Sequence, residues 1–301
     1  MNKSERIIEL YYKNKEWSNK RIANEIGVSK RHVRRVLNPM RDSGKLPKIL
    51  LFDIETLPCS VLVWGLYKQM ISPDNVISDW ACLGWSGKWL FDSKIISDIL
   101  TPEEALIKND KRIMESMWKV IDEADIVIAH NGDRFDVRRI NARFLLNDIQ
   151  PPSSYQTIDT MKVAKRYFAF SSYKLDYITK ILGIDQKLST SFGLWKRCLA
   201  GDSKALKEMQ VYNKNDVRIL EEVYLVLRPW IKSHPNVSLF TNLTELTCPN
   251  CGDTNLTENG KYYTPAGRFV SYRCKCGAIS RSRYSDLSKE ERENLLVSVA
   301  R

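Results

Sequence analysis

Two acidic residues stand where the chain should bury only apolar ones. Asp53 and Glu55 follow the apolar run Ile49-Leu50-Leu51-Phe52, so we expect them on a buried strand, where alternation points both side chains to one face. Burying unpaired charge is costly, whereas a bound divalent cation turns neighbouring carboxylates into a set of ligands. The sequence therefore predicts a core strand that carries two metal ligands.

Two later segments supply further acidic residues. Residues 124–129 are predicted to form a second buried strand that ends near His130, after which Asp136 begins a helix. A later helical pattern places Tyr212 and Asp216 four residues apart, so both project from one side of that helix. Each segment alone is commonplace, and an Asp-x-Glu pair is often a capping or loop element. The three together, in this order, indicate a nuclease site.

In this order the segments resemble the Exo I, Exo II and Exo III motifs of the DEDD 3′–5′ exonucleases, in the subgroup with tyrosine in the third motif. The exonuclease domain of family B DNA polymerases is similar, and stand-alone phage and bacterial versions exist. The resemblance spans about residues 48–230. It implies a ribonuclease H-like α/β fold, a mixed sheet flanked by helices. The matching residues are Asp53, Glu55, Asn131, Phe135, Asp136, Tyr212 and Asp216.

The resemblance implies a 3′–5′ exonuclease that hydrolyses DNA, at single-stranded ends, with two Mg²⁺ or Mn²⁺ ions about 3.5–4 Å apart. Asp53 is expected to bridge both ions, and Glu55 and Asp216 to complete the ion that holds the attacking water. Asp136 is expected to serve the second ion through water, and Tyr212 to orient the nucleophile. The sister subgroup uses a histidine base before the last aspartate, but none of the three histidines is placed for that role.

The amino-terminal region carries most of the net charge of +11, because residues 1–48 hold 13 Lys and Arg against 5 Asp and Glu. Residues 18–37 resemble a helix-turn-helix, with Gly27 in the turn and Ser29 able to cap the second helix. Alternatively this region is a small bundle whose basic face is only solvated, or a protein-binding module. If it binds nucleic acid, the second helix would offer Lys30, Arg31, Arg34 and Arg35.

Four cysteines near the carboxyl end have the spacing of a zinc ribbon. Cys248 and Cys251 form one knuckle, and Cys274 and Cys276 form a second that is one residue shorter than usual. Four thiolates suit one structural Zn²⁺. Disulfides are the alternative, disfavoured in a reducing cytoplasm. Aromatic and arginine residues on this ribbon, among them Arg268 and Arg273, could bind single strands, but they could equally supply its small core.

These features predict four regions: a helix-turn-helix at 1–46, the nuclease domain at 47–240, the ribbon at 241–284 and a helix or tail at 285–301. Within the last region, residues 285–300 are expected to form a surface helix with apolar residues available for docking. Asn131, Phe135, Tyr173 and Lys174 are candidates for contact with nucleic acid, although for Tyr173 and Lys174 helix capping by Ser172 is an equal alternative. We expect a cytoplasmic protein, in a host cell if phage-encoded, without a signal peptide or membrane span. Replication or recombination proteins are possible partners.

Other functions of the same fold remain open at this stage. RNA could replace DNA as the substrate, because no residue is seen to read the 2′-hydroxyl. A structure-specific endonuclease would use the same acidic residues. A non-catalytic binding or regulatory protein could keep the fold as a scaffold, although the complete acidic set argues against this.

Overall fold

The computed structural model describes residues 3–14, 17, 19–29, 32–33, 46–184, 188, 190–241 and 245–299. The chain divides into two compact units. The larger unit comprises Lys48–Pro235, and the smaller comprises Met1–Pro47 together with Asn236–Arg301. The three acidic segments therefore lie in the larger unit, and the four-cysteine motif lies in the smaller one.

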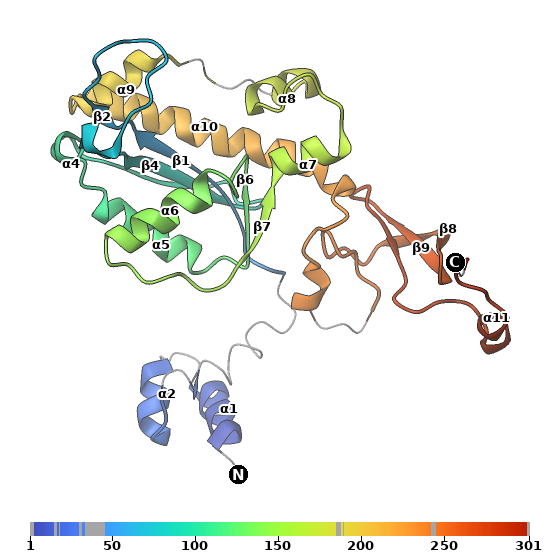
Figure 1. Cartoon of the computed structure of the whole chain (residues 1–301). Helices are drawn as coiled ribbons and strands as arrows, with labels where there is room; N and C mark the ends of the chain where they lie inside the picture. The colour runs from blue at the N-terminus through green and yellow to red at the C-terminus, as the bar shows by residue number, and fades with distance from the viewer. Residues whose placement is uncertain are drawn as a thin grey trace. The chain divides into compact units, whose positions relative to one another are not determined.

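Five strands form a mixed sheet in the larger unit, in the order β5-β4-β1-β6-β7 (Figure 1). β1 pairs with β4 in antiparallel and with β6 in parallel orientation, while β7 runs parallel to β6 and β5 antiparallel to β4. The apolar run before Asp53 lies fully buried on the central strand, as predicted. The strands are β1 (Ile49–Leu57), β4 (Ala81–Trp89), β5 (Ile95–Ile99), β6 (Ile126–Ala129) and β7 (Gln156–Asp159).

Helices cover both faces of this sheet. The side chains of β1 alternate between the two faces and therefore contact helices on each side. Asp53 accepts a hydrogen bond from Asn213 on α10, whereas Trp85, the cross-strand partner of Ile54, donates to Ser116 on α5. The predicted α/β architecture is confirmed. The helices of this unit are α4 (Pro102–Ile107), α5 (Lys111–Ile121), α6 (Asp136–Leu146), α7 (Thr160–Tyr167), α8 (Leu175–Leu182), α9 (Phe192–Leu199), α10 (Ser203–Leu227) and the 3₁₀ turn η2 (Arg228–Trp230).

Residues 58–80 connect β1 to β4 and contain β2, the 3₁₀ turn η1 and β3. Lys108 holds the two ends of this connection together, since its amino group donates to the carbonyl oxygens of Pro58 at 2.8 Å and Asp79 at 3.0 Å. Desolvation lowers the pKa of this lysine from its ordinary value. The elements of this connection are β2 (Ser60–Val61), η1 (Pro73–Asn75) and β3 (Val76–Ser78).

The amino-terminal part of the smaller unit contains two helices, α1 (Lys3–Lys13) and α2 (Asn19–Ile26). They pack around a small core of Ile7, Ile22, Ala23 and Val33. Gly27 adopts a left-handed φ of 68°, and the hydroxyl of Ser29 accepts a hydrogen bond from the amide of His32 at 3.1 Å. The four basic residues expected to contact nucleic acid, Lys30, Arg31, Arg34 and Arg35, lie outside the described residues.

The carboxyl-terminal part of the smaller unit is a three-stranded antiparallel sheet, in the order β10-β9-β8. The expected helix at 285–300 was wrong in extent: α11 covers only Lys289–Glu293. Its apolar residues do not stabilise a longer helix, because Leu296 and Val299 remain 92% and 81% exposed. The remaining elements are η3 (Val237–Phe240), β8 (Leu256–Thr264), β9 (Gly267–Cys274) and β10 (Ile279–Arg281).

Each helix in the described part of the chain is too short or too polar to serve as a membrane-crossing segment.

Candidate active site and metal centres

The central strand and the longest helix bring the first and third acidic segments together. Asp53 and Glu55 lie on one side of β1, and Asp216 lies on α10, one turn after Tyr212. One carboxylate oxygen from each of Asp53, Glu55 and Asp216 lies within 4.8 Å of the others. The three acidic residues predicted from separate motifs therefore form one cluster.

Asn213 holds the first of these carboxylates in place. Its side-chain amide donates to Oδ2 of Asp53 at 2.6 Å, and the residue is only 2% exposed. An amide that donates to one carboxylate oxygen fixes the orientation of the group and leaves its other lone pairs for further ligands. Asn213 was not predicted from the sequence. The available signal was its place inside the third motif, directly after Tyr212.

Asp136 lies at the first turn of α6, as predicted, but outside the cluster of three carboxylates. It is 2% exposed, and its Oδ1 accepts a hydrogen bond from the amide of Ile54 at 3.2 Å. Desolvation raises the pKa of Asp136 to about 7, whereas the hydrogen bond from the Ile54 amide acts to lower it. A carboxyl group in this position keeps its proton more readily than an exposed one, because burial disfavours the charge.

We expect the stability of the protein without added divalent metal to fall as pH rises from about 4 to 7. The folded state binds the Asp136 proton more tightly than the unfolded state, so raising the pH through this window removes about 2–4 kcal/mol of stability. Asp136→Asn keeps an acceptor for Ile54 and should flatten this slope. Urea denaturation of both proteins at pH 4.5, 6 and 8 measures it. Equal slopes would refute the assignment.

The turn between β6 and α6 is fixed by three contacts. His130 donates through Nε2 to the carbonyl oxygen of Tyr173 at 2.9 Å, and its Nδ1 lies 2.9 Å from Oγ1 of Thr160. Asn131 has a left-handed φ of 67°, and its amide donates to Oδ1 of Asp159 at 2.9 Å. Both ring nitrogens of His130 are thus engaged within the protein. Asp159, which was not predicted from the sequence, anchors the second motif.

Gly132 is required in this turn by close packing. A Cβ atom at this position would lie 2.4 Å from the Cβ of Ala129, far inside van der Waals contact. The turn leads directly into α6, so its displacement would move Asp136. Glycine here is therefore a condition for the geometry of the site.

We expect Gly132→Ala to lower the free energy of unfolding by about 1–3 kcal/mol, the usual cost of an overpacked position. Adding Ala129→Gly should recover part of the loss, since it removes the clashing methyl group at a cost of about 0.5–1 kcal/mol for glycine in a strand. Urea denaturation of the single and double variants measures the coupling. If the two losses simply add, the contact does not constrain the turn.

A cleft of about 370 Å³ opens beside the carboxylate cluster. Asp53 and Asp216 line it together with Asn131 and Lys174, two of the predicted nucleic-acid contacts. Tyr173 is not among its lining residues, and its hydroxyl donates to the carbonyl oxygen of Phe168 at 3.0 Å. The structure thus brings Asn131 and Lys174 to the cluster and engages the Tyr173 hydroxyl in local structure.

A second hollow of about 440 Å³ lies on the other side of Glu55 along β1. Its lining includes Phe192 and Trp195 from α9, and Trp195 packs edge-on against Tyr212 with ring centroids 6.4 Å apart. Phe135, the remaining aromatic candidate, lies half-buried under the guanidinium of Arg139, 4.4 Å from its ring centroid. Phe192, which is 61% exposed, therefore offers a more open aromatic surface than Phe135. Its lining residues are Thr56, Pro58, Thr190, Ser191, Phe192 and Trp195.

The donors of the acidic cluster fit hard divalent cations. Asp53, Glu55 and Asp216 offer only carboxylate oxygens, which Mg²⁺ and Mn²⁺ prefer and which soft metals do not select. Bringing three carboxylates this close is unfavourable without a compensating positive charge. The cluster is therefore compatible with the predicted magnesium or manganese site.

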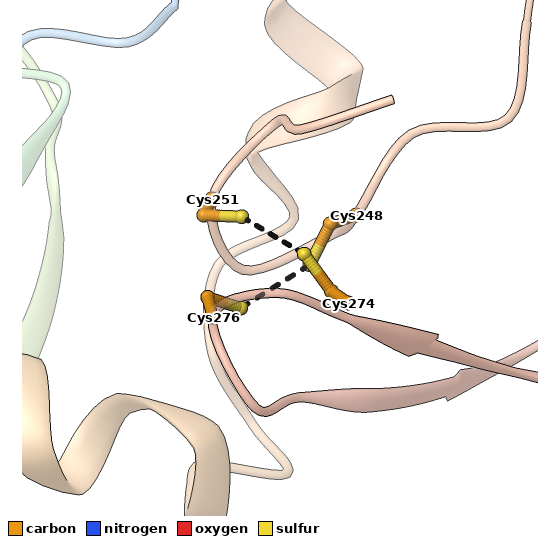
Figure 2. Close-up of side chains that lie close together, drawn as sticks. All are labelled: Cys248, Cys251, Cys274 and Cys276. Carbon is orange, nitrogen blue, oxygen red and sulfur yellow. Dashed lines mark hydrogen bonds between the residues drawn. The ribbon is translucent and has the colours of Figure 1, made fainter. Parts of the chain in front are cut away.

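The four cysteine sulfurs of the ribbon form one cluster, within 4.8 Å of one another (Figure 2). The sulfur of Cys248 lies 3.8 Å from that of Cys276, and Cys251 lies 3.5 Å from Cys274. Four sulfurs at about 2.3 Å from a tetrahedral zinc ion are about 3.8 Å apart, whereas a disulfide bond is about 2.05 Å long. The cluster is therefore compatible with a structural zinc ion.

The two arginines predicted to bind nucleic acid on the ribbon differ in their surroundings. Arg268 forms ion pairs with Asp286 at 3.0 Å and Glu291 at 3.2 Å, so the chain's own tail occupies its guanidinium. Arg273 is exposed and makes a long hydrogen bond of 3.4 Å to Asn259. The structure thus favours Arg273 over Arg268 as a contact for an external anion.

Part of the larger unit is similar to a known superfamily of proteins. Residues 94–228 match the family model described as RNase H superfamily. None of the curated proteins matches the chain. A similar solved structure is the family B DNA polymerase from the hyperthermophilic archaeon Pyrobaculum calidifontis, with 14% identity and a TM-score of 0.47 over 62% of this chain. The chain spans only about a quarter, 25%, of that polymerase. The larger unit of this chain, with its five-stranded mixed sheet flanked by helices, has a ribonuclease H-like fold.

Proposed function

We propose that the chain is a metal-dependent 3′–5′ exonuclease that hydrolyses phosphodiester bonds of single-stranded DNA. The observation that carries this proposal is the cluster of Asp53, Glu55 and Asp216 beside an open cleft in a ribonuclease H-like domain. Carboxylates in this arrangement suit divalent ions, and a cleft suits a polymer that enters from outside. The fold and the acidic donors together support a nuclease more than a scaffold.

In this proposal Asp53, Glu55 and Asp216 hold the metal ions, with Asn213 fixing the orientation of Asp53. When bound, such ions activate water and neutralise the charge that grows on the phosphate. The hydroxyl of Tyr212, one helical turn from Asp216, orients the attacking water. Asp136 serves the site from the edge of the cluster.

The surroundings of the cluster give the substrate two contacts. Lys174 lies in the cleft with Asp53 and Asp216, and within the described residues it forms no ion pair, so its ammonium group is available to a phosphate. The second hollow offers Phe192 and Trp195 to a base of the bound strand by stacking. A DNA strand that contacts both Lys174 and the second hollow would have its scissile phosphate between these two contacts, at the carboxylates.

The test is digestion of DNA labelled at the 5′ end, in parallel with a matching RNA strand, in the presence of Mg²⁺. We expect a ladder of products that shorten one nucleotide at a time from the 3′ end of the DNA. Internal cuts in a strand with a blocked 3′ end would instead identify an endonuclease. Faster shortening of RNA would change the substrate class, and absence of any metal-dependent product would refute the nuclease proposal.

A further inference from the structure

The two faces of the ribbon sheet carry different side chains, because residues alternate along each strand. Tyr262 on β8 lies opposite Phe269 on β9, and these directly paired residues share a face. Arg273 lies four residues after Phe269 and therefore on the same face, and Arg281 joins it as the partner of Ser271. We call this surface the aromatic–arginine face, defined by Tyr262, Phe269, Arg273 and Arg281.

The Arg281 guanidinium lies over the half-buried ring of Phe269, while Tyr262 and both arginines of this face are accessible. The guanidinium carbon of Arg281 lies 4.1 Å from the ring centroid of Phe269 and 6.0 Å from that of Tyr262. Tyr262 is 49% exposed, and both Arg273 and Arg281 are exposed. In the part of the chain that the structure describes, neither arginine forms an ion pair with an acidic residue. The positive charge of this face is therefore available to an external anion.

The opposite face differs because the chain's own tail neutralises it. Lys261 forms an ion pair with Asp286 at 2.8 Å, and Arg268 pairs with both Asp286 and Glu291. The tail is also fixed to β9 by its backbone, since the amide of Asp286 donates to the carbonyl oxygen of Arg268 at 2.9 Å. Acidic residues thus compensate the basic residues on one face only.

We propose that the aromatic–arginine face binds single-stranded nucleic acid. A base would stack on Tyr262, while Arg273 and Arg281 would contact phosphates. An exposed ring beside guanidinium groups that form no ion pair within the described residues suits a ligand that combines flat rings with regular negative charge, and the bases of a single strand are free to stack. An acidic peptide would satisfy the arginines but would leave the Tyr262 ring without a matching partner. Between residues 248 and 283 the chain has six Lys and Arg against two Asp and Glu, which supports a polyanionic ligand.

This binding site is independent of the proposed nuclease activity, and it is tested without cleavage. The probe is a fluorescein-labelled oligothymidine, titrated by fluorescence anisotropy with the full chain carrying Asp53→Asn, in buffer without magnesium. We expect Tyr262→Ala to weaken binding about tenfold, since stacking of one base contributes about 5- to 150-fold in affinity. Tyr263→Ala is the matched control: it removes the neighbouring tyrosine, 70% exposed, from the opposite face.

Charge is tested by salt dependence. Each phosphate contact that is lost should reduce the slope of log affinity against log salt by about 0.7 for a single strand. We therefore expect Arg273→Ala and Arg281→Ala each to reduce the slope, while Lys261→Ala, which removes the same charge from the neutralised face, leaves it unchanged. Zinc content equal to that of the parent protein shows that each variant keeps the ribbon folded.

Three outcomes would overturn the inference. Equal losses for Tyr262→Ala and Tyr263→Ala would show that the two faces are not distinguished. No loss for any variant would show that the ribbon does not bind this strand. Concentration-dependent dimers in sedimentation, abolished by Tyr262→Ala while oligothymidine binding is unchanged, would identify the face as a contact between two copies of the chain.

Discussion

Asp53→Ala is expected to abolish magnesium-dependent DNA degradation, with a loss of at least about a thousandfold in kcat, or about 4 kcal/mol of transition-state stabilisation. Asp53 lies in one cluster with Glu55 and Asp216 and is the carboxylate that Asn213 orients. The fold should persist, because the substitution removes repulsion between carboxylates in the absence of metal.

Single-turnover digestion of 5′-labelled DNA measures this loss, and Glu115→Ala, which removes an exposed carboxylate on α5, is the control. Tyr212→Phe separates orientation of the water from metal binding: it should slow cleavage while calorimetry with Mn²⁺ shows unchanged affinity. Undiminished cleavage by Asp53→Ala in a protein of native stability would refute the site. Loss of cleavage together with unfolding would be resolved by Asp53→Asn, which preserves the shape of the side chain.

Cys276→Ser is expected to release one zinc ion per chain and to unfold the ribbon. The four sulfurs form a single cluster, and the small core of Cys248, Cys274 and Ala278 depends on it. In small zinc domains the apparent binding free energy, about 10–16 kcal/mol, is also the folding free energy. We expect Cys248→Ser to have the same effect. The ribonuclease H-like domain should remain folded, because it has a separate core.

Elemental analysis measures the zinc, and proton–nitrogen NMR spectra show which amide signals lose dispersion. Cys59→Ser is the matched control, since Cys59 is an exposed cysteine far from the cluster in sequence, hydrogen-bonded to Asp79 at 3.3 Å. It should keep the full zinc content. Zinc that stays bound in both Cys248→Ser and Cys276→Ser would contradict a site made of four cysteines, as would protein that contains no zinc when purified without chelators.

The sequence pattern alone predicted the structure correctly where a strand or helix determines the direction of its own side chains. The alternation after Phe52 predicted that Asp53 and Glu55 share a face of a central strand, and the four-residue spacing predicted that Tyr212 and Asp216 share a side of α10. The start of α6 at Asp136 was also predicted correctly. In each case the periodicity of 2 or 3.6 residues determines the direction of the side chains without reference to the rest of the chain.

The sequence pattern alone did not predict the structure correctly where the stability of a helix depends on the surface it packs against. Residues 285–300 have the apolar spacing of a helix, but α11 ends at Glu293. A short amphipathic helix gains its stability by burying its apolar face, and in this structure Leu296 and Val299 are exposed. The sequence shows which face would be buried but not whether a surface exists to bury it.

The sequence by itself determined the acidic residues of the site, the order of the motifs and the spacing of the four cysteines. Only the tertiary structure showed that Asn213 orients Asp53 across 160 positions of chain, that Asp159 anchors the turn at Asn131, and that Asp136 accepts a hydrogen bond from the amide of Ile54 on β1. It also showed that Asp286 neutralises Arg268. These contacts join segments distant in sequence, so they depend on how elements pack and not on the periodicity within any one of them.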